Sequence, residues 1–248
     1  MQGFIRKFKI VNKFHLLLTS VALLSLSGCA SLSEEECQLG DWYQIGLADG
    51  QEGKKNQSAT YSKDCAEYGV AVDAQRYNNG RSDGLKSYCS YNNGILVGQA
   101  NKEYENVCPA ELANEFLAGY TPYYNLAKAS AYLRSIEDNV SYYKSKLDDE
   151  STPADERQTF TTGLKSAKAE LKRVKNDVSR YELELELHKV VREIAGINEE
   201  LAIDSISASH RLQLNNRLAT LRDKQNYYET LVQTDNTIQN IKHIADLF

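Results

Sequence analysis

Two carboxylates occupy equivalent positions in a short repeat and are the residues best suited to acid–base chemistry. Asp49 and Asp83 each precede a glycine, and each follows a tyrosine by six residues. Paired carboxylates can serve as general acid and base on glycosides. An Asp-Gly pair near a helix end also caps or turns the backbone, and no histidine, G-x-S-x-G motif or phosphate-binding loop accompanies these two. We therefore favour a structural role for both aspartates and expect no enzymatic activity.

Aromatic and charged side chains near these carboxylates define a second possibility, a ligand surface for an envelope glycan such as peptidoglycan. Tyrosine and tryptophan rings can stack on sugars, but a small domain also needs them in its core, which is the interpretation we prefer. A weak hydrolase would be the enzymatic version of this alternative. The possible ligand surface comprises Trp42, Tyr43, Asp49, Tyr77, Arg81, Asp83 and Tyr91.

Four cysteines fall within one stretch of the chain and predict two disulfides. They are Cys37, Cys65, Cys89 and Cys108. An even number of cysteines in an exported chain is typical of a disulfide framework. A metal site would need clustered ligands such as C-x-x-C or nearby histidines, and neither occurs here, so we predict no metal and no cofactor. Of the three possible pairings we favour Cys37 with Cys65 and Cys89 with Cys108, because these close the shorter loops.

The pattern Tyr-x-x-Gly-x-x-x-Gly occurs three times among these cysteines, beginning at Tyr43, Tyr77 and Tyr91. In a helix these residues lie on one side and leave a shallow groove beside an aromatic ring. Each interior glycine costs roughly 0.5–1 kcal/mol relative to alanine, which makes sense if another backbone packs into the groove. Asp41 and Asp73 are suitable N-caps. We predict helices for the first two copies and a loop or turn for the third, residues 91–98.

The order and spacing of these residues resemble a bacterial lipoprotein family called domain of unknown function 2799. The resemblance covers about residues 37–120 and implies export and fold only, because the family has no assigned activity. Ala100 departs from the family pattern, in which a further glycine is expected. The resemblance rests on Asp41-Trp42-Tyr43, Asp49-Gly50, Tyr77-x-x-Gly80-x-x-x-Gly84, Tyr88-Cys89, Asn93-Gly94, Cys108-Pro109 and Gly119-Tyr120.

Residues 1–28 are typical of an export signal. They carry four basic residues and no acids, and residues 14–26 form an apolar run too short for a membrane span. The run ends in Leu26-Ser27-Gly28-Cys29, which resembles the lipobox of bacterial lipoproteins. In that motif the cysteine thiol receives a diacylglyceryl group and cleavage follows before the cysteine. We therefore predict lipidation of Cys29 with acyl chains such as palmitate, and several chains give lasting membrane attachment.

The residues after Cys29 indicate where the protein is anchored. Ala30 and Ser31 follow without an aspartate, which resembles the pattern sorted to the outer membrane. We therefore place the protein in the cell envelope, anchored on the periplasmic face of the outer membrane, with residues 29–36 as a lipidated polar tether. Removing residues 1–28 leaves 25 basic against 34 acidic residues, a net charge of −9. This charge disfavours nonspecific binding to nucleic acid.

Residues 121–248 differ from the region before them in composition. Nine of 14 glycines lie between Gly40 and Gly98, whereas the later chain is rich in helix formers and interrupted only by Pro122 and Pro153. Apolar residues recur there at spacings of three and four, which predicts amphipathic, coiled-coil-like helices that must bury their seams. Two overlapping phases meet near residues 183–187, so more than one surface needs a neighbour. A turn at Gly196 or at residues 205–209 would fold the chain back on itself.

The sequence therefore predicts a mainly α protein with four segments: a signal peptide at 1–28, a tether at 29–36, a small disulfide-stapled Gly/Tyr-rich helical domain at 37–120 and a helical hairpin or bundle at 121–248. The leading functional hypothesis is a non-enzymatic structural or adaptor lipoprotein that contacts a protein partner, or itself, through residues 121–248. The alternative is the glycan-binding module or weak hydrolase that uses the surface of residues 41–98.

Overall fold

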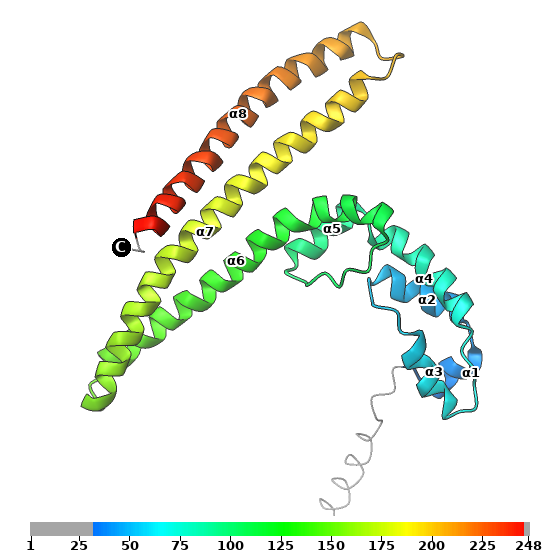
Figure 1. Ribbon diagram of the computed structural model, residues 1–248, viewed down its shortest axis with the longest axis horizontal. Helices are drawn as coiled ribbons and strands as arrows, with labels where there is room; N and C mark the ends of the chain where they lie inside the picture. Colours follow the sequence, from blue (N-terminus) through cyan, green and yellow to red (C-terminus); the bar gives the residue numbers. More distant parts are fainter. Residues whose placement is uncertain (1–31, 246–248) are drawn as a thin grey trace, which may run out of the picture.

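The computed structural model describes residues 32–245, with side chains through residue 235, and folds them into eight helices without a strand in that range (Figure 1). This confirms the prediction of a mainly α protein in which a disulfide-bonded region precedes long helices. The helices are α1 (Glu34–Leu39), α2 (Trp42–Gln51), α3 (Ser58–Ala66), α4 (Ala74–Tyr88), α5 (Tyr91–Gln99), α6 (Ala110–Asp148), α7 (Ala154–Leu201) and α8 (Ala208–Ala245).

The described residues begin at Leu32, inside the segment 29–36 that we predicted to be a tether. Ser33 caps α1 in a capping box with Glu36. Leu32 and Cys37 lie in the same buried cluster on either side of this cap, which is the arrangement of a hydrophobic staple. Residues 34–36 therefore belong to the first helix, and the lipidated tether at residues 29–36 stays a prediction. Cys29 and residues 1–28 lie outside the described residues.

The first two copies of the glycine repeat form one pair of parallel helices, α2 and α4. A Cβ on Gly46 would overlap the carbonyl oxygen of Tyr77, and one on Gly80 would overlap that of Tyr43. Gly50 and Gly84 meet the facing backbone in the same way one turn later. The glycines of each helix thus allow the backbone of the other helix to pack closely. The segment that connects the end of α2 to the start of α4 contains α3. The predicted N-caps Asp41 and Asp73 are both present.

The third copy is a helix, so our prediction of a loop or turn at residues 91–98 is wrong. Ser90 caps α5, and its side chain accepts a hydrogen bond from the Asn93 N–H. Gly94 receives the Phe116 carbonyl of α6, and Gly119 receives that of Tyr91. The missing charged residues made this copy look irregular, but its partner is a fourth, degenerate copy that begins at Phe116. This second parallel pair therefore repeats the packing of the first.

Both disulfides have the pairing that the loop lengths favour. Cys37 bonds Cys65, which ties α1 to α3, and Cys89 bonds Cys108, which ties the end of α4 to the loop between α5 and α6. Each bridge therefore holds a segment on which the chain returns between two parallel helices. The loop-entropy model gives about 3 kcal/mol of stabilisation for a loop of this length.

The remaining helices fold back and forth as antiparallel neighbours, α6 against α7 and α7 against α8 (Figure 1). The chain turns at residues 149–153 and again at 202–207, and α7 passes through Gly196 without a break. α6 likewise continues through Pro122. The boundary that we predicted between residues 120 and 121 therefore falls inside a single helix, and the separation into two folding units stays a prediction.

The two overlapping apolar phases of α7 correspond to two neighbours. Ala167 and Val174 are buried in the half of α7 that packs along α6. Val190 and Ile197 are instead buried in a cluster with the leucines of α8, among them Leu221, which is 1% exposed. The change of phase near residue 185 is thus where α7 begins to bury a second face, and the chain itself covers both.

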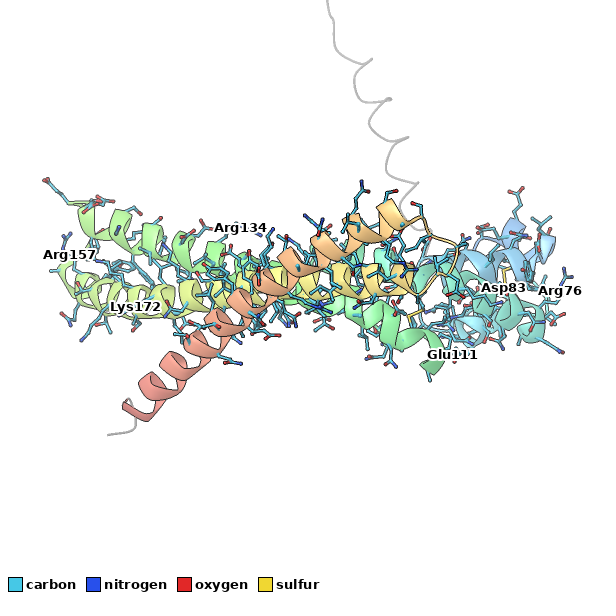
Figure 2. All side chains as sticks on the ribbon, turned by 90° about the horizontal axis from the view of Figure 1, so that it is seen from above. Arg76, Asp83, Glu111, Arg134, Arg157 and Lys172 are labelled. Carbon is cyan, nitrogen blue, oxygen red and sulfur yellow. A yellow bond between two sulfur atoms is a disulfide. The ribbon has the colours of Figure 1, made fainter. Side chains whose placement is uncertain are left out.

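Among the described side chains, charged residues lie at both ends of the molecule, with Arg157 at one end and Arg76 at the other (Figure 2). Within residues 32–245, none of the helices carries an apolar stretch long enough to cross a bilayer.

Candidate functional site

The tyrosine and aspartate of each repeat reach across to the other helix of the pair. Tyr43 Oη donates to Asp83 Oδ2 at 2.9 Å, and Tyr77 Oη donates to Asp49 Oδ2 at 2.9 Å. The spacing of six residues between tyrosine and aspartate places both on the glycine face, one turn on either side of the close contact. The repeated pattern therefore encodes a reciprocal helix pair, in which the glycines set the distance and the hydrogen bonds set the register.

Asp49 lies at the centre of a buried polar cluster. Its residue is 3% exposed, and the carboxylate also accepts from Tyr61 Oη at 2.7 Å and Lys54 Nζ at 3.1 Å. Burial, reinforced by the hydrogen bond to Asp49, raises the pKa of Tyr77 to about 12, although the Gln57 N–H on its oxygen opposes this. Burial likewise raises the pKa of Tyr61. Asp49 thus serves as a fully engaged acceptor within the core.

Asp83 keeps access to solvent, because its side chain is 42% exposed. A hydrogen bond from Lys86, followed by the one from Tyr43, holds the pKa of Asp83 below its ordinary value. The hydrogen bond between Tyr43 and Asp83 also raises the pKa of Tyr43. Asp83 borders a shallow depression with Tyr43, Arg76, Asn79 and Ser82, at one end of the molecule (Figure 2). Solvent can reach this carboxylate, whereas its equivalent in the repeat, Asp49, is buried.

The other residues of the predicted ligand surface are dispersed. Trp42 is 4% exposed and Tyr77 is fully buried, both in the cluster around the Cys37–Cys65 disulfide. Arg81 donates two hydrogen bonds to the Lys54 carbonyl, at 3.2 and 2.7 Å. Tyr91 lies on the second helix pair and faces α7. The structure therefore does not bring the seven residues together on one surface.

Tyr91 belongs to a contact between the second helix pair and α7 that the sequence analysis missed. Its hydroxyl lies 3.2 Å from His188 Nε2, and the Arg192 guanidinium lies over its ring at 4.1 Å from the centroid. Arg192 also pairs with Glu115 of α6 at 3.4 Å. Burial, and then the charge of Arg192, lowers the pKa of His188. The contact therefore holds a neutral imidazole between the two regions.

One sequence signal pointed to this contact. The fourth copy, which begins at Phe116, has Pro122 where the first two have aspartate, so Tyr91 has no carboxylate partner across the pair. A tyrosine freed from that role is available to another element. The sequence alone does not say which element, because residue 188 lies 97 positions away.

A cleft of about 620 Å³ lies between the two helix pairs and was also missed. It is bordered by the end of α2, the loop that follows it, α5 and the loop after α5. Most of its residues lie outside the three copies of the repeat, which is why the spacing of motifs gave no indication of it. Its lining consists of Gln51, Glu52, Gly53, Lys54, Lys55, Gln57, Tyr88, Asn93, Val97, Lys102, Glu103 and Glu105.

Histidines, cysteines and acids do not gather into a group of three that could hold a metal ion, within the part of the chain that the structure describes. The prediction of no metal and no cofactor stays a prediction.

The disulfide-bonded region is thus a helical domain made of two parallel glycine-packed pairs, each closed by a cystine-tied return segment. Residues 41–124 match the family described as protein of unknown function, DUF2799. This confirms the resemblance based on the tyrosine, glycine and cysteine spacing. Neither a curated protein nor a solved structure gives a match to the chain.

Proposed function

We propose that this protein is a lipid-anchored cell-envelope lipoprotein that acts as a structural or adaptor protein. In this proposal Cys29 carries the lipid and the outer membrane is the anchoring surface. The helices α6, α7 and α8 form an arm that meets a protein partner in the periplasm. The protein performs no reaction of its own.

The continuity of α6 carries this proposal. Its first turns pack in the second glycine pair, through Phe116 and Gly119, and its last turns lie against α7 far from that pair. A helix of 39 residues is about 58 Å long, and α7, with 48 residues, is about 72 Å long. One rigid element therefore belongs both to the anchored domain and to the arm.

The burial of Leu32 in the core also supports it. Leu32 lies three positions after Cys29, and three residues can span at most about 10 Å. A lipid on Cys29 would therefore hold the disulfide-bonded domain at the membrane surface, while the arm would keep any contact at a fixed distance from it. Because α6 and α8 already cover the two seams of α7, we expect the partner to touch exposed side chains of the arm.

Photo-crosslinking in cells tests this function. A crosslinking residue in place of Tyr142, a half-exposed residue beside the turn between α6 and α7, should give one discrete adduct with another protein. The matched position is Leu39, which is 78% exposed on α1 in the anchored domain and should give no such adduct. The Tyr142 adduct should be lost in the Cys29→Ala chain, which cannot be lipidated. An absence of adducts along the arm, together with retention of the protein on purified peptidoglycan, would refute the adaptor function and favour glycan binding.

A further inference from the structure

The cleft between the two helix pairs has the size of a ligand site. Its volume of about 620 Å³ falls within the range of about 300–1,000 Å³ that is common for small-molecule pockets. The proposed adaptor function makes no use of it. Segments of both helix pairs border it, so it exists only when the two pairs are joined.

The floor of the cleft is aromatic and rigid. The backbone of Gly53 lies so close to the Tyr88 ring that a Cβ there would overlap the ring, and its φ of +69° suits glycine. Tyr88 stacks on Phe116 with ring centroids 5.2 Å apart, and Asn93 Nδ2 donates to the Tyr88 carbonyl at 2.8 Å. Val97 adds an aliphatic side chain beside this floor. Tyr88 is 8% exposed, so only a small part of it, together with Val97, can meet the apolar part of a ligand.

The walls of the cleft carry both charges in equal number. Lys54, Lys55 and Lys102 line it together with Glu52, Glu103 and Glu105. This balance disfavours a polyanion such as nucleic acid and equally a polycation. It suits a ligand that itself carries both charges.

Most of these charges are already paired. Lys54 Nζ lies 2.8 Å from Glu52, and Lys55 pairs with Glu105 across the cleft. Lys102 and Glu103 form no ion pair within the described side chains, although they are neighbours in the chain. One cation and one anion therefore stand side by side at the edge of the cleft.

The backbone that carries Lys102 and Glu103 is held from several directions. The Lys102 carbonyl accepts from Tyr120 Oη at 3.0 Å, and the same hydroxyl accepts from the Tyr104 N–H at 3.1 Å. The Lys102 N–H donates to the Val97 carbonyl at 3.2 Å. The disulfide from Cys89 to Cys108 closes the loop. An exposed loop fixed in this way presents its charges in a preorganised position, which favours binding.

We propose that this cleft binds a small zwitterionic ligand, an amino acid or short peptide that carries both an amine and a carboxylate. The Lys102 ammonium pairs with the carboxylate of the ligand and Glu103 with its amine. Tyr88 and Val97 contact the aliphatic part between the two charges. The proposal is independent of the adaptor function, because it uses neither the arm nor the lipid.

Calorimetric titration of the full chain in detergent, with the dipeptide lysyl-glutamate as the probe, tests this site. Saturable binding is expected with a Kd of about 1 mM or tighter. Because both side chains are exposed, Lys102→Ala/Glu103→Ala should keep the helical circular dichroism of the parent while weakening binding by roughly tenfold or more. The matched control, Lys172→Ala/Glu182→Ala, also removes one exposed charge of each sign, from α7, and should bind as the parent does.

Three outcomes would overturn the proposal. The first is that the dipeptide shows no saturable binding up to about 10 mM. The second is that the Lys102→Ala/Glu103→Ala chain binds the dipeptide as tightly as the parent does. The third is that the α7 control loses as much affinity as the Lys102→Ala/Glu103→Ala chain. A titration with an N-acetylglucosamine oligomer in the same detergent separates this ligand class from a glycan. Binding of the sugar, without binding of the dipeptide, would assign the cleft to glycans and refute the zwitterion.

Discussion

Asp49 and Asp83 stand at the same position of the repeat but meet different surroundings. Each accepts a tyrosine hydroxyl from the opposite helix. Only Asp49 is covered, because Tyr61 of α3 closes over it. The sequence could predict the symmetry, since both aspartates have the same spacing to tyrosine and glycine. It could not predict that Asp49 is buried, because the residue that covers it, Tyr61, is not part of the repeat. Tyr61 reaches Asp49 only because the segment between α2 and α4 folds back against this helix pair.

The glycine contacts give the sharpest prediction at this scale. Gly46→Ala and Gly80→Ala place a Cβ against a carbonyl oxygen of the facing helix, so the pair must separate. We expect each substitution to lower the free energy of unfolding by about 1–3 kcal/mol, as overpacking does. Urea unfolding followed by circular dichroism measures this change.

Gly196→Ala is the matched control for these two substitutions. Gly196 lies inside α7 with no atom within 4 Å of an added Cβ. Alanine should stabilise the helix there by up to about 1 kcal/mol. If all three substitutions changed the free energy of unfolding alike, the glycines would act through helix propensity. The idea that Gly46 and Gly80 allow α2 and α4 to pack closely would then be refuted.

At the scale of elements, α7 connects the parts of the molecule. It buries one face against α6, another against α8, and it touches α5 through His188 and Tyr91. The offset of the apolar phases predicted that two faces need neighbours, and the structure supplies both from the same chain. The contact with α5 was not predictable, since a lone histidine and a lone tyrosine have no periodicity.

The contact at His188 should make stability depend on pH. The folded pKa of His188 is below its ordinary value of 6.5, so the unfolded chain takes up a proton first as the pH falls. Stability is therefore fully present above pH 6.5 and is lost as the pH falls from there through the lowered pKa. His188→Gln removes this titration and keeps a polar group for Tyr91.

Urea unfolding of the parent and of His188→Gln between about pH 5 and pH 8 measures the difference. The parent should lose more stability than the variant as the pH is lowered. Parallel curves for the two chains would mean that His188 is protonated as readily in the fold as in the unfolded chain.

At the scale of the whole molecule, the arm and the disulfide-bonded domain share α6. The change in composition after the glycine-rich region predicted two regions of different construction, and the helices on each side bear this out. The predicted boundary at residue 120 has no counterpart in the backbone, because a helix that serves both regions shows no capping or breaking residue where they meet. Even Pro122 leaves α6 unbroken.

Removal of α8 should change how the molecule associates. A chain ending at residue 207 exposes Val190 and Ile197 of α7, which α8 otherwise covers through Leu214, Leu218 and Leu221. We expect concentration-dependent association of this chain in sedimentation velocity. A chain ending at residue 235 keeps those three leucines and should sediment as the full chain does. If the shorter chain were monomeric at all concentrations, the apolar face of α7 would not need α8 to keep it from associating, and the prediction would be wrong.

The parallel arrangement of the glycine pairs has a consequence for the order of folding. Gly46 meets α4 only about 35 residues later in the chain, and Gly94 meets α6 after about 25, so all the close backbone contacts of this domain span short stretches. Contacts of short sequence separation form fast. Under the export that we propose, the N-terminus would cross the membrane first, so both pairs and both cystines could be complete while residues beyond 125 are still crossing. We therefore expect the disulfide-bonded domain to be finished first, and to provide the surface on which the arm then assembles.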